Sequence, residues 1–167
     1  MLPQSERFLV YSQNHDQVGN RAVGDRLLHE QLKVAAACTL FAPHTPLLFM
    51  GEEYGERRPF QFFTDHIDPA IAEATREGRK REFERFAAFS GELPDPQAVE
   101  TFERSKLDRS AGDEELRAFY RELLALRRRL PREGTVEVDE QARTLRARRG
   151  DVELVADFAN ATVELRT

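Results

Sequence analysis

Two clusters of side chains in this sequence carry groups suited to acid–base chemistry, and each follows a short apolar run. His15 and Asp16 follow Arg7–Ser12, a segment rich in β-branched and aromatic residues. Glu52 and Glu53 follow a second apolar run. An Asp and a His on a loop can bind hydroxyl groups or transfer protons, and paired carboxylates are the groups that cleave glycosidic bonds. Two alternatives remain open. His15 and Asp16 could have a structural role in their loop, and one of the two glutamates could cap or salt-bridge its own loop.

The elements before each cluster must position it. Apolar residues at helical spacing predict a helix over Asp25–Phe41, which Pro43 and Pro46 end, and Leu47–Met50 predicts a second buried strand. Strand, helix and strand in this order are typical of two parallel strands with a crossover helix. Active sites of such folds lie at the carboxyl ends of the strands, where both clusters fall. Two parallel strands cannot cover their own faces, so we expect the rest of the sheet upstream of Met1 or in another chain.

The rest of the chain combines helices with a terminal β module. A long polar and aromatic loop includes Phe60–His66, whose phenylalanines either form walls for sugar rings or anchor the loop. Helices are predicted over Ala70–Phe89 and Asp113–Leu130, around an irregular stretch with short helical turns over Ser90–Asp113. Four short alternating segments then predict an antiparallel β module: Thr135–Val138, Leu145–Arg148, Leu154–Phe158 and Val163–Leu165.

Composition excludes several classes of function. The 167 residues carry a net charge of −5, which argues against nucleic-acid and anionic-membrane partners. No apolar run reaches the ~18 residues that a membrane-spanning helix needs. The single cysteine, Cys38, leaves no disulfide framework and suits a reducing cytoplasm. We therefore expect a soluble cytoplasmic protein, with no ligand spacing for a metal and no cofactor.

Several motifs in sequence make one resemblance specific, and it covers nearly the whole chain. Phe8–Asp16 ends in Asn-His-Asp and resembles the strand-seven motif of the α-amylase family. The segments that resemble one branch of that family, the malto-oligosyltrehalose trehalohydrolases of glycoside hydrolase family 13, are Gln17–Arg26, Thr45–Gly55, Phe60–His66 and Thr101–Leu107.

This resemblance implies an α/β fold, the C-terminal part of a (β/α)8 TIM barrel followed by a β-sandwich. Residues 1–131 would supply strands seven and eight with their helices, and residues 132–167 the start of a truncated sandwich. The family hydrolyses the α-1,4-glucosidic bond next to the terminal trehalose unit of malto-oligosyltrehalose, with retention of configuration. The implied partner is therefore an α-glucan.

The resemblance also implies roles for single residues. Asp16 matches the family's third carboxylate, which grips sugar hydroxyls and stabilises the oxocarbenium-like transition state. His15 would hydrogen-bond the same sugar, while Asn14, Gln17 and Arg21 would shape the subsite. The nucleophile and the acid/base belong to strands four and five, which this chain lacks. We therefore expect a C-terminal fragment that is inactive without the N-terminal barrel segment.

Three other hypotheses remain. The chain is a part of a related enzyme such as a glycogen branching enzyme, or it is a non-catalytic α-glucan-binding module. In the third, Asp16 and one of Glu52 or Glu53 form a complete acid pair. For the two glutamates, however, the resemblance implies architecture near the site rather than nucleophilic attack.

Overall fold

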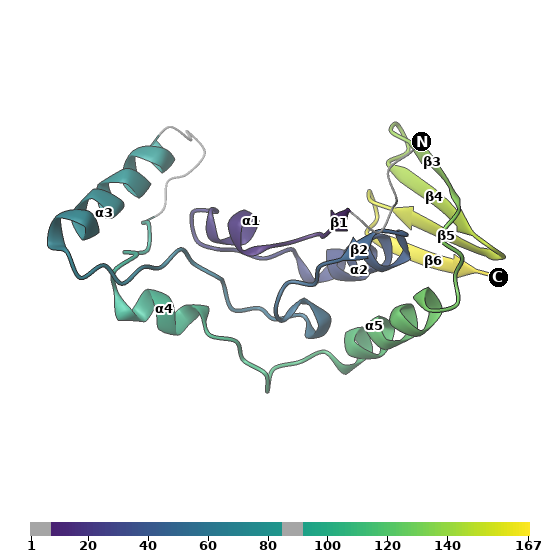
Figure 1. Cartoon of the computed structure of the whole chain (residues 1–167), viewed down its shortest axis with the longest axis horizontal. Helices are drawn as coiled ribbons and strands as arrows, with labels where there is room; N and C mark the ends of the chain where they lie inside the picture. The colour runs from purple at the N-terminus through teal and green to yellow at the C-terminus, as the bar shows by residue number, and fades with distance from the viewer. Residues whose placement is uncertain (1–7, 85–91) are drawn as a thin grey trace. The chain divides into compact units, whose positions relative to one another are not determined.

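The computed structural model describes residues 8–84 and 92–167, and Figure 1 marks their helices and strands. Arg7 of the first expected strand and the end of the helix expected over Ala70–Phe89 lie outside these ranges. The chain divides into two units, which are described separately. Unit 1 comprises Met1–Ser12, Leu27–Glu56 and Ala111–Thr167, and unit 2 comprises Gln13–Arg26 and Arg57–Ser110.

Unit 1 begins with a pair of very short parallel strands. β1 (Leu9–Val10) pairs with β2 (Thr45–Pro46), and the Leu47 N–H donates to the Val10 carbonyl at 2.9 Å. The parallel arrangement is as predicted, but placing the second strand at Leu47–Met50 was wrong. Pairing is limited to the residues that lie opposite β1, and within the expected strand Leu47, Leu48 and Met50 are 38%, 39% and 42% exposed.

The helix expected over Asp25–Phe41 starts later than predicted. α2 covers Leu32–Phe41, and a 3-10 turn, η2, covers His29–Gln31. Leu28, one of the apolar residues at helical spacing, is extended and 59% exposed, and its N–H donates to the Gln31 side-chain oxygen. The local capping interaction therefore sets the start of the helix, and apolar spacing does not.

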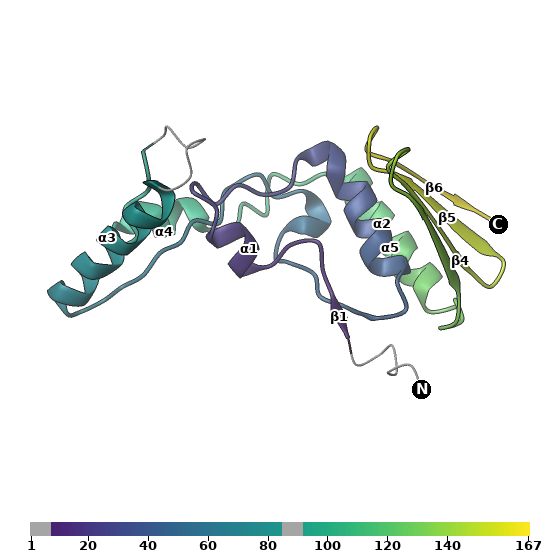
Figure 2. The same ribbon diagram turned by 90° about the horizontal axis from the view of Figure 1, so that it is seen from above.

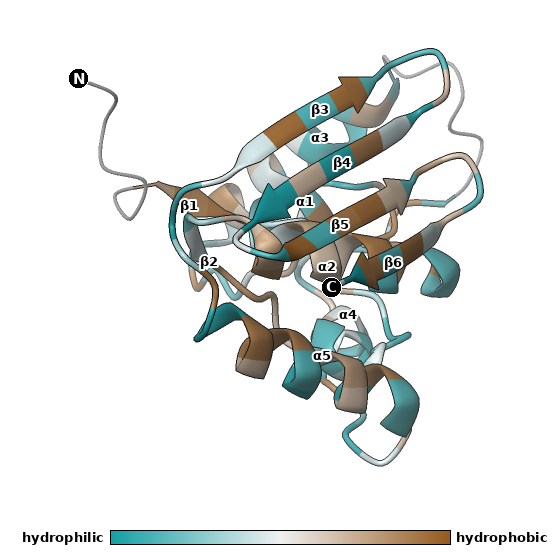
Figure 3. Cartoon of the chain, turned by 90° about the vertical axis from the view of Figure 1, so that its right-hand side faces the viewer, coloured by the Kyte–Doolittle hydropathy of each residue, from teal (hydrophilic) through white to brown (hydrophobic). Residues whose placement is uncertain are grey.

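The β module is confirmed as one four-stranded antiparallel sheet. Its strands follow chain order: β3 (Thr135–Asp139), β4 (Thr144–Arg149), β5 (Val152–Asp157) and β6 (Thr162–Arg166). Along β5, Val152, Leu154 and Ala156 are buried while the residues between them are partly exposed. Figure 3 shows that apolar residues make up much of this strand. The period of two in burial gives the sheet one apolar face.

The apolar face of the sheet and two helices form the core of unit 1. α2 packs against both the sheet and α5 (Glu114–Arg127), and Figure 2 shows the two helices beside the sheet. The core residues are Leu32, Ala36, Ala37, Leu40, Phe41, Leu116, Tyr120, Leu123, Ala147, Val152 and Leu154. Full burial of one leucine contributes about 1.5–3 kcal/mol, so these side chains bind helices and sheet into one unit.

The described residues of unit 2 form three helices and an aromatic cluster. The helices are α1 (His15–Gly19), α3 (Pro69–Glu84) and α4 (Val99–Ser105). The Phe63 ring packs edge to face between Phe60 and Phe102, with centroids 5.8 and 5.2 Å away. These contacts within the unit agree with the anchoring interpretation of the aromatic loop.

Gly24 joins the α1 region to the aromatic loop, and its replacement by Ala should destabilise unit 2. Its φ is +68°, its carbonyl accepts from the Phe60 N–H at 2.8 Å, and an added Cβ would overlap the Phe60 carbonyl. Left-handed strain and this overlap together should reduce the free energy of unfolding by about 2 kcal/mol or more, measured in urea by circular dichroism. Gly78→Ala is the control: it lies in α3 with nothing near its Cβ position, and should stabilise by about 0.5–1 kcal/mol. A loss at Gly78 as large as that at Gly24 would contradict the explanation.

Asp113 is the N-cap of α5, and this cap should make the stability of the fold depend on pH. Its carboxylate accepts from the Leu116 N–H at 3.0 Å and lies 3.0 Å from the His29 Nε2. The Leu116 hydrogen bond is the main reason why the pKa of Asp113 lies below its ordinary value. A lowered carboxylate pKa adds stability above the ordinary pKa, and this stability is lost as pH falls through the folded-state value.

Asp113→Ala is therefore expected to lower the free energy of unfolding by about 1 kcal/mol at pH 7. Urea titrations repeated at decreasing pH should show the difference from the parent chain narrowing below about pH 4. Asp113→Asn keeps a capping oxygen and should retain most of the stability. An Asn variant as unstable as the Ala variant would show that the cap does not stabilise the helix.

Candidate functional site

The polar residues that follow β1 form a short capped helix, not the loop expected for them. Asn14 is extended, with φ of −148°, and its Oδ1 accepts from the Gln17 N–H at 2.7 Å. This N-cap starts α1 at His15. Val18, on the inner side of the helix, is buried at 2% exposure. One apolar contact and one cap therefore fix a five-residue helix that presents its first residues outward.

His15 and Asp16 form a pair on the exposed side of α1. The His15 Nε2 lies 3.2 Å from an Asp16 carboxylate oxygen, and their side chains are 73% and 70% exposed. Asp16 also lies in the first turn, where the helix dipole favours a negative charge. The arrangement holds an accessible carboxylate beside an imidazole, which suits binding of a neutral polar ligand.

Arg21 lies just after α1 and is directed by a neighbour. Its Nη1 donates to the Asp25 carboxylate at 2.6 Å, and both side chains are about half exposed. The structure thus brings Asn14, His15, Asp16, Gln17 and Arg21 together in one segment of unit 2. The contact of Gln17 is made by its backbone N–H, which donates to the Asn14 side-chain oxygen in the helix cap.

Arg79 also contacts this segment, and the sequence did not predict it as a site residue. From α3, its Nη2 donates to the carbonyls of Gly19 and Arg21 at 3.3 and 3.4 Å, which follow the exposed pair. Its guanidinium lies 4.7 Å from the Phe62 ring centroid and 4.8 Å from that of Phe83. Burial lowers its pKa below the ordinary value, although the nearby carboxylate of α3 partly offsets this. Arg79 therefore fixes the carbonyl end of α1 against α3.

The loop with the two glutamates, Glu52 and Glu53, lies in unit 1, and the two side chains differ in burial. Two left-handed glycines, Gly51 with φ of 89° and Gly55 with φ of 70°, bracket the 3-10 turn η3 (Glu52–Tyr54). Glu52 is 2% exposed, whereas Glu53 is exposed. Burial is the main reason why the Tyr120 pKa is raised, and the negative charges of Glu52 and then Glu53 add to it. Glu52 is thus tied to the helix α5, which agrees with an architectural role.

Within residues 8–84 and 92–167, no three His, Cys, Asp or Glu side chains are grouped so as to hold a metal ion. In the same ranges, no helix combines the length and the apolar character that crossing a bilayer requires.

No protein-family model matches this chain, but curated proteins do. A malto-oligosyltrehalose trehalohydrolase of Rhizobium sp. (strain M-11) is 50% identical over 172 residues, which cover 94% of this chain and 29% of the relative. The protein of the same name from Brevibacterium helvolum is 48% identical over 179 residues, or 98% of this chain and 30% of the relative. That from Saccharolobus solfataricus is 45% identical over 126 residues, or 73% of this chain and 21% of the relative.

All seven curated relatives that match carry this name, at 43–51% identity. The chain spans less than a third of their length, 21–30%. Among solved structures, a putative α-amylase from Salmonella typhimurium superposes with a TM-score of 0.75 and 44% identity, over 90% of this chain and 28% of that one. Sequence and structure therefore point to the same family of carbohydrate hydrolases.

Proposed function

Because the chain belongs to the malto-oligosyltrehalose trehalohydrolase family, we propose that it supplies part of the α-glucan site of an enzyme that releases trehalose. The observation that carries the proposal is the identity of 43–51% to seven relatives of that one name. In the proposed reaction, the α-1,4 bond next to the terminal trehalose unit of malto-oligosyltrehalose is hydrolysed. The whole enzyme includes a further, N-terminal barrel segment that this chain does not contain.

The proposed place of the chain in that enzyme is the C-terminal part of a (β/α)8 barrel. β1 and β2 would be strands seven and eight, with residues 1–131 in the barrel and residues 132–167 beginning a β-sandwich. The proposal is supported by exposed apolar side chains on and beside both strands, among them Leu9 at 61% and Leu48 at 39%. Buried parallel sheets need further strands and helices over such faces.

In the proposed mechanism, Asp16 stabilises positive charge as it develops on the sugar ring. Retaining hydrolysis requires a carboxylate nucleophile and a separate acid/base, and both would come from the remainder of the enzyme. Asp16 would accept hydrogen bonds from the hydroxyls of the sugar at the cleaved bond. Its exposed carboxylate and its position in the first turn of a capped helix support this role, because a fixed charge needs no reorganisation when the transition state forms.

The neighbouring residues would then position Asp16 and the sugar. His15 would donate to a hydroxyl of the same ring, and its contact with Asp16 would limit the carboxylate's rotation. Asn14 would act through the cap that sets the helix start. Gln17 and Arg21 would line the subsite, and Arg79 would hold the helix from behind.

Neither broader alternative is favoured. The seven matching relatives are named as trehalohydrolases, so a branching-enzyme function has no comparable support. A purely glucan-binding module has no specific observation in its favour, and the acid pair of Asp16 with Glu52 or Glu53 stays a hypothesis that the buried position of Glu52 disfavours. For the location we propose the cytoplasm, where the half-buried Cys38, whose pKa partial burial raises to about 11, would stay a thiol.

The test is trehalose release from malto-oligosyltrehalose, by this chain alone and by this chain co-expressed with a segment that supplies strands one to six. We expect no release by the chain alone and release by the complemented enzyme. Release by the chain alone would contradict the proposal that the nucleophile and the acid/base come from elsewhere. Glu53 would then be the first residue to replace.

A further inference from the structure

A basic cleft lies among the segment Pro43–Thr45 that follows α2, the C-terminal part of α5 with the residues after it, and β4, away in sequence from the residues around Asp16. Its volume is about 460 Å³, and four of the residues that line it are arginines: Arg127, Arg128, Arg132 and Arg149. The remaining described lining residues are apolar or hydroxylic, with Pro43, Thr45 and Leu124 among them, and none of those described is acidic. All of them belong to unit 1.

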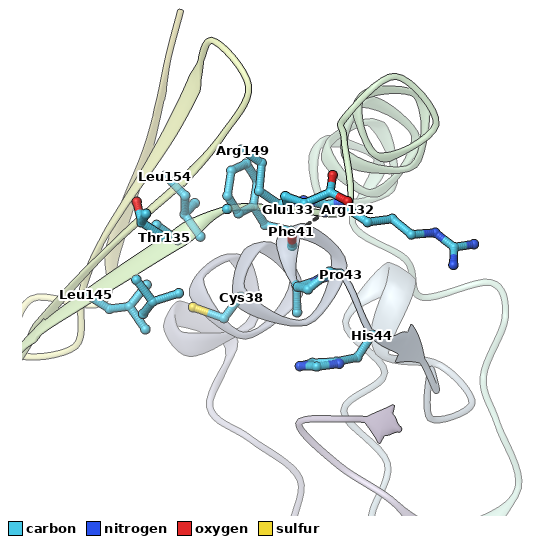
Figure 4. A pocket seen from close by; sticks show the side chains of 14 residues that line it. Cys38, Phe41, Pro43, His44, Arg132, Glu133, Thr135, Leu145, Arg149 and Leu154 are labelled. Carbon is cyan, nitrogen blue, oxygen red and sulfur yellow. Dashed lines mark hydrogen bonds between the residues drawn. The ribbon is translucent and has the colours of Figure 1, made fainter. Parts of the chain in front are cut away.

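Two of the four guanidinium groups are held in place by backbone carbonyls. Arg127 donates to the carbonyls of Leu40, Ala42 and His44, where α2 ends. Arg149, with 5% of its surface exposed, donates to the carbonyls of Phe41 and, at 2.8 Å, Pro131. Figure 4 shows Arg149 folded against Phe41 and Arg132 extending away from them.

These hydrogen bonds cap α2, but they use only some of the N–H donors of the two arginines and neutralise only part of their positive charge. A guanidinium has five N–H donors, and the bonds above use three of Arg127 and two of Arg149. The carbonyl end of a helix carries only about half a negative charge, against two full positive charges. Burial lowers the pKa of both arginines. The positive charge of Arg132 lowers the pKa of Arg127 further, and the charge of Arg127 does the same to Arg149. The cations are thus close enough to repel one another.

We propose that this cleft binds the phosphate group of a small ligand, either inorganic phosphate or a phosphorylated sugar. Arginine forks match phosphate oxygens in pairs, and a dianion offsets more of the clustered charge than a carboxylate does. Arg127 and Arg149 supply a rigid inner wall, because their backbone contacts fix them before a ligand arrives. Arg128 and Arg132, which are exposed, close on the ligand from the outside.

A second cleft adjoins the basic cleft and would bind the sugar ring of a phosphorylated sugar. It measures about 450 Å³ and shares Pro43, Arg132 and Arg149 with the basic cleft. His44 and Glu133 add polar groups that can bind hydroxyls, and Figure 4 shows both at its border. A ligand with a phosphate and a hydroxyl-bearing ring would use both clefts, whereas inorganic phosphate would use the basic one alone.

The test is calorimetric titration of the 167-residue chain with sodium phosphate, glucose 6-phosphate and acetate at matched ionic strength. We expect phosphate to bind with a Kd of about 1 mM or tighter, and acetate more weakly. Glucose 6-phosphate binding at least about tenfold tighter than phosphate would identify a phosphorylated sugar, and equal affinities would identify inorganic phosphate. No binding of either phosphate compound up to about 20 mM would overturn the proposal.

Matched variants separate the cleft from the net charge. Arg128→Ala with Arg132→Ala removes the two exposed arginines of the cleft, and should weaken phosphate binding by about tenfold or more. Arg121→Ala with Arg129→Ala removes two exposed arginines that do not line it, and should change the affinity by less than about twofold. Equal losses in both double variants would overturn the proposal. No glucan is present in this assay, so its outcome is independent of the proposed hydrolysis.

Discussion

Replacing Asp16 with Asn is expected to reduce trehalose release by about 10³-fold in the complemented enzyme. The amide keeps the size of the side chain but loses the charge that would face the oxocarbenium-like transition state. Because this charge matters most when the transition state forms, kcat should fall far more than KM changes. Initial rates over a range of malto-oligosyltrehalose concentrations measure both quantities.

The control for this variant is Asp151→Asn. Asp151 is an exposed Asp in the turn between β4 and β5, so the substitution makes the same chemical change outside unit 2. Its rate should equal that of the parent enzyme. An Asp16→Asn enzyme that keeps more than about a tenth of the parent kcat would contradict the transition-state role and leave Asp16 as a binding residue.

Leu123→Ala should cause the largest loss of stability, about 3 kcal/mol. Leu123 is 1% exposed and lies in the core where α5 packs on α2. Its truncation removes apolar contacts and leaves a cavity that neighbouring helices cannot fully close. Urea unfolding of the chain, followed by circular dichroism, gives the free energy of unfolding.

Leu124→Ala, the next position on α5, makes the same truncation on an exposed face. Leu124 is 38% exposed, so its loss should cost less than about 1 kcal/mol. If the two variants lost equal stability, burial on α5 would not explain the difference, and the packing of α2 between α5 and the sheet would not be the stabilising feature.

The parts of the fold that sequence predicted well are those set by neighbours in the chain. The α5 helix combined an Asp113 cap with an apolar stripe, and both are local signals. The β module combined short segments rich in apolar residues with turn residues between them, and both signals come from neighbours in the chain. The candidate site residues Asn14, His15, Asp16, Gln17 and Arg21 lie within eight positions of the sequence, so one short motif could suggest them together, and their roles stay predictions.

The predictions that were wrong or missing depend on competing local interactions or on contacts between residues far apart in the sequence. The polar run before Val18 reads as a loop, yet a single Asn14 cap and one buried side chain suffice for α1. Leu28 has the spacing of a core residue, but its backbone bonds the Gln31 side chain and stays extended. Arg79 contacts the carbonyl of Gly19 from 60 positions away, and no local pattern connects the two.

The first strand of the sheet has a consequence for handling the protein at high concentration. β3 is an end strand of the sheet, and its Val136 and Val138 are each 64% exposed. A strand edge with apolar side chains is a template on which another chain can add, the first step of aggregation. Glu137 and Asp139 alternate with these valines and place like charges along the edge, where stacked copies would repel. Salt screens that repulsion, so the chain should stay monodisperse at low ionic strength and self-associate through β3 as salt is raised.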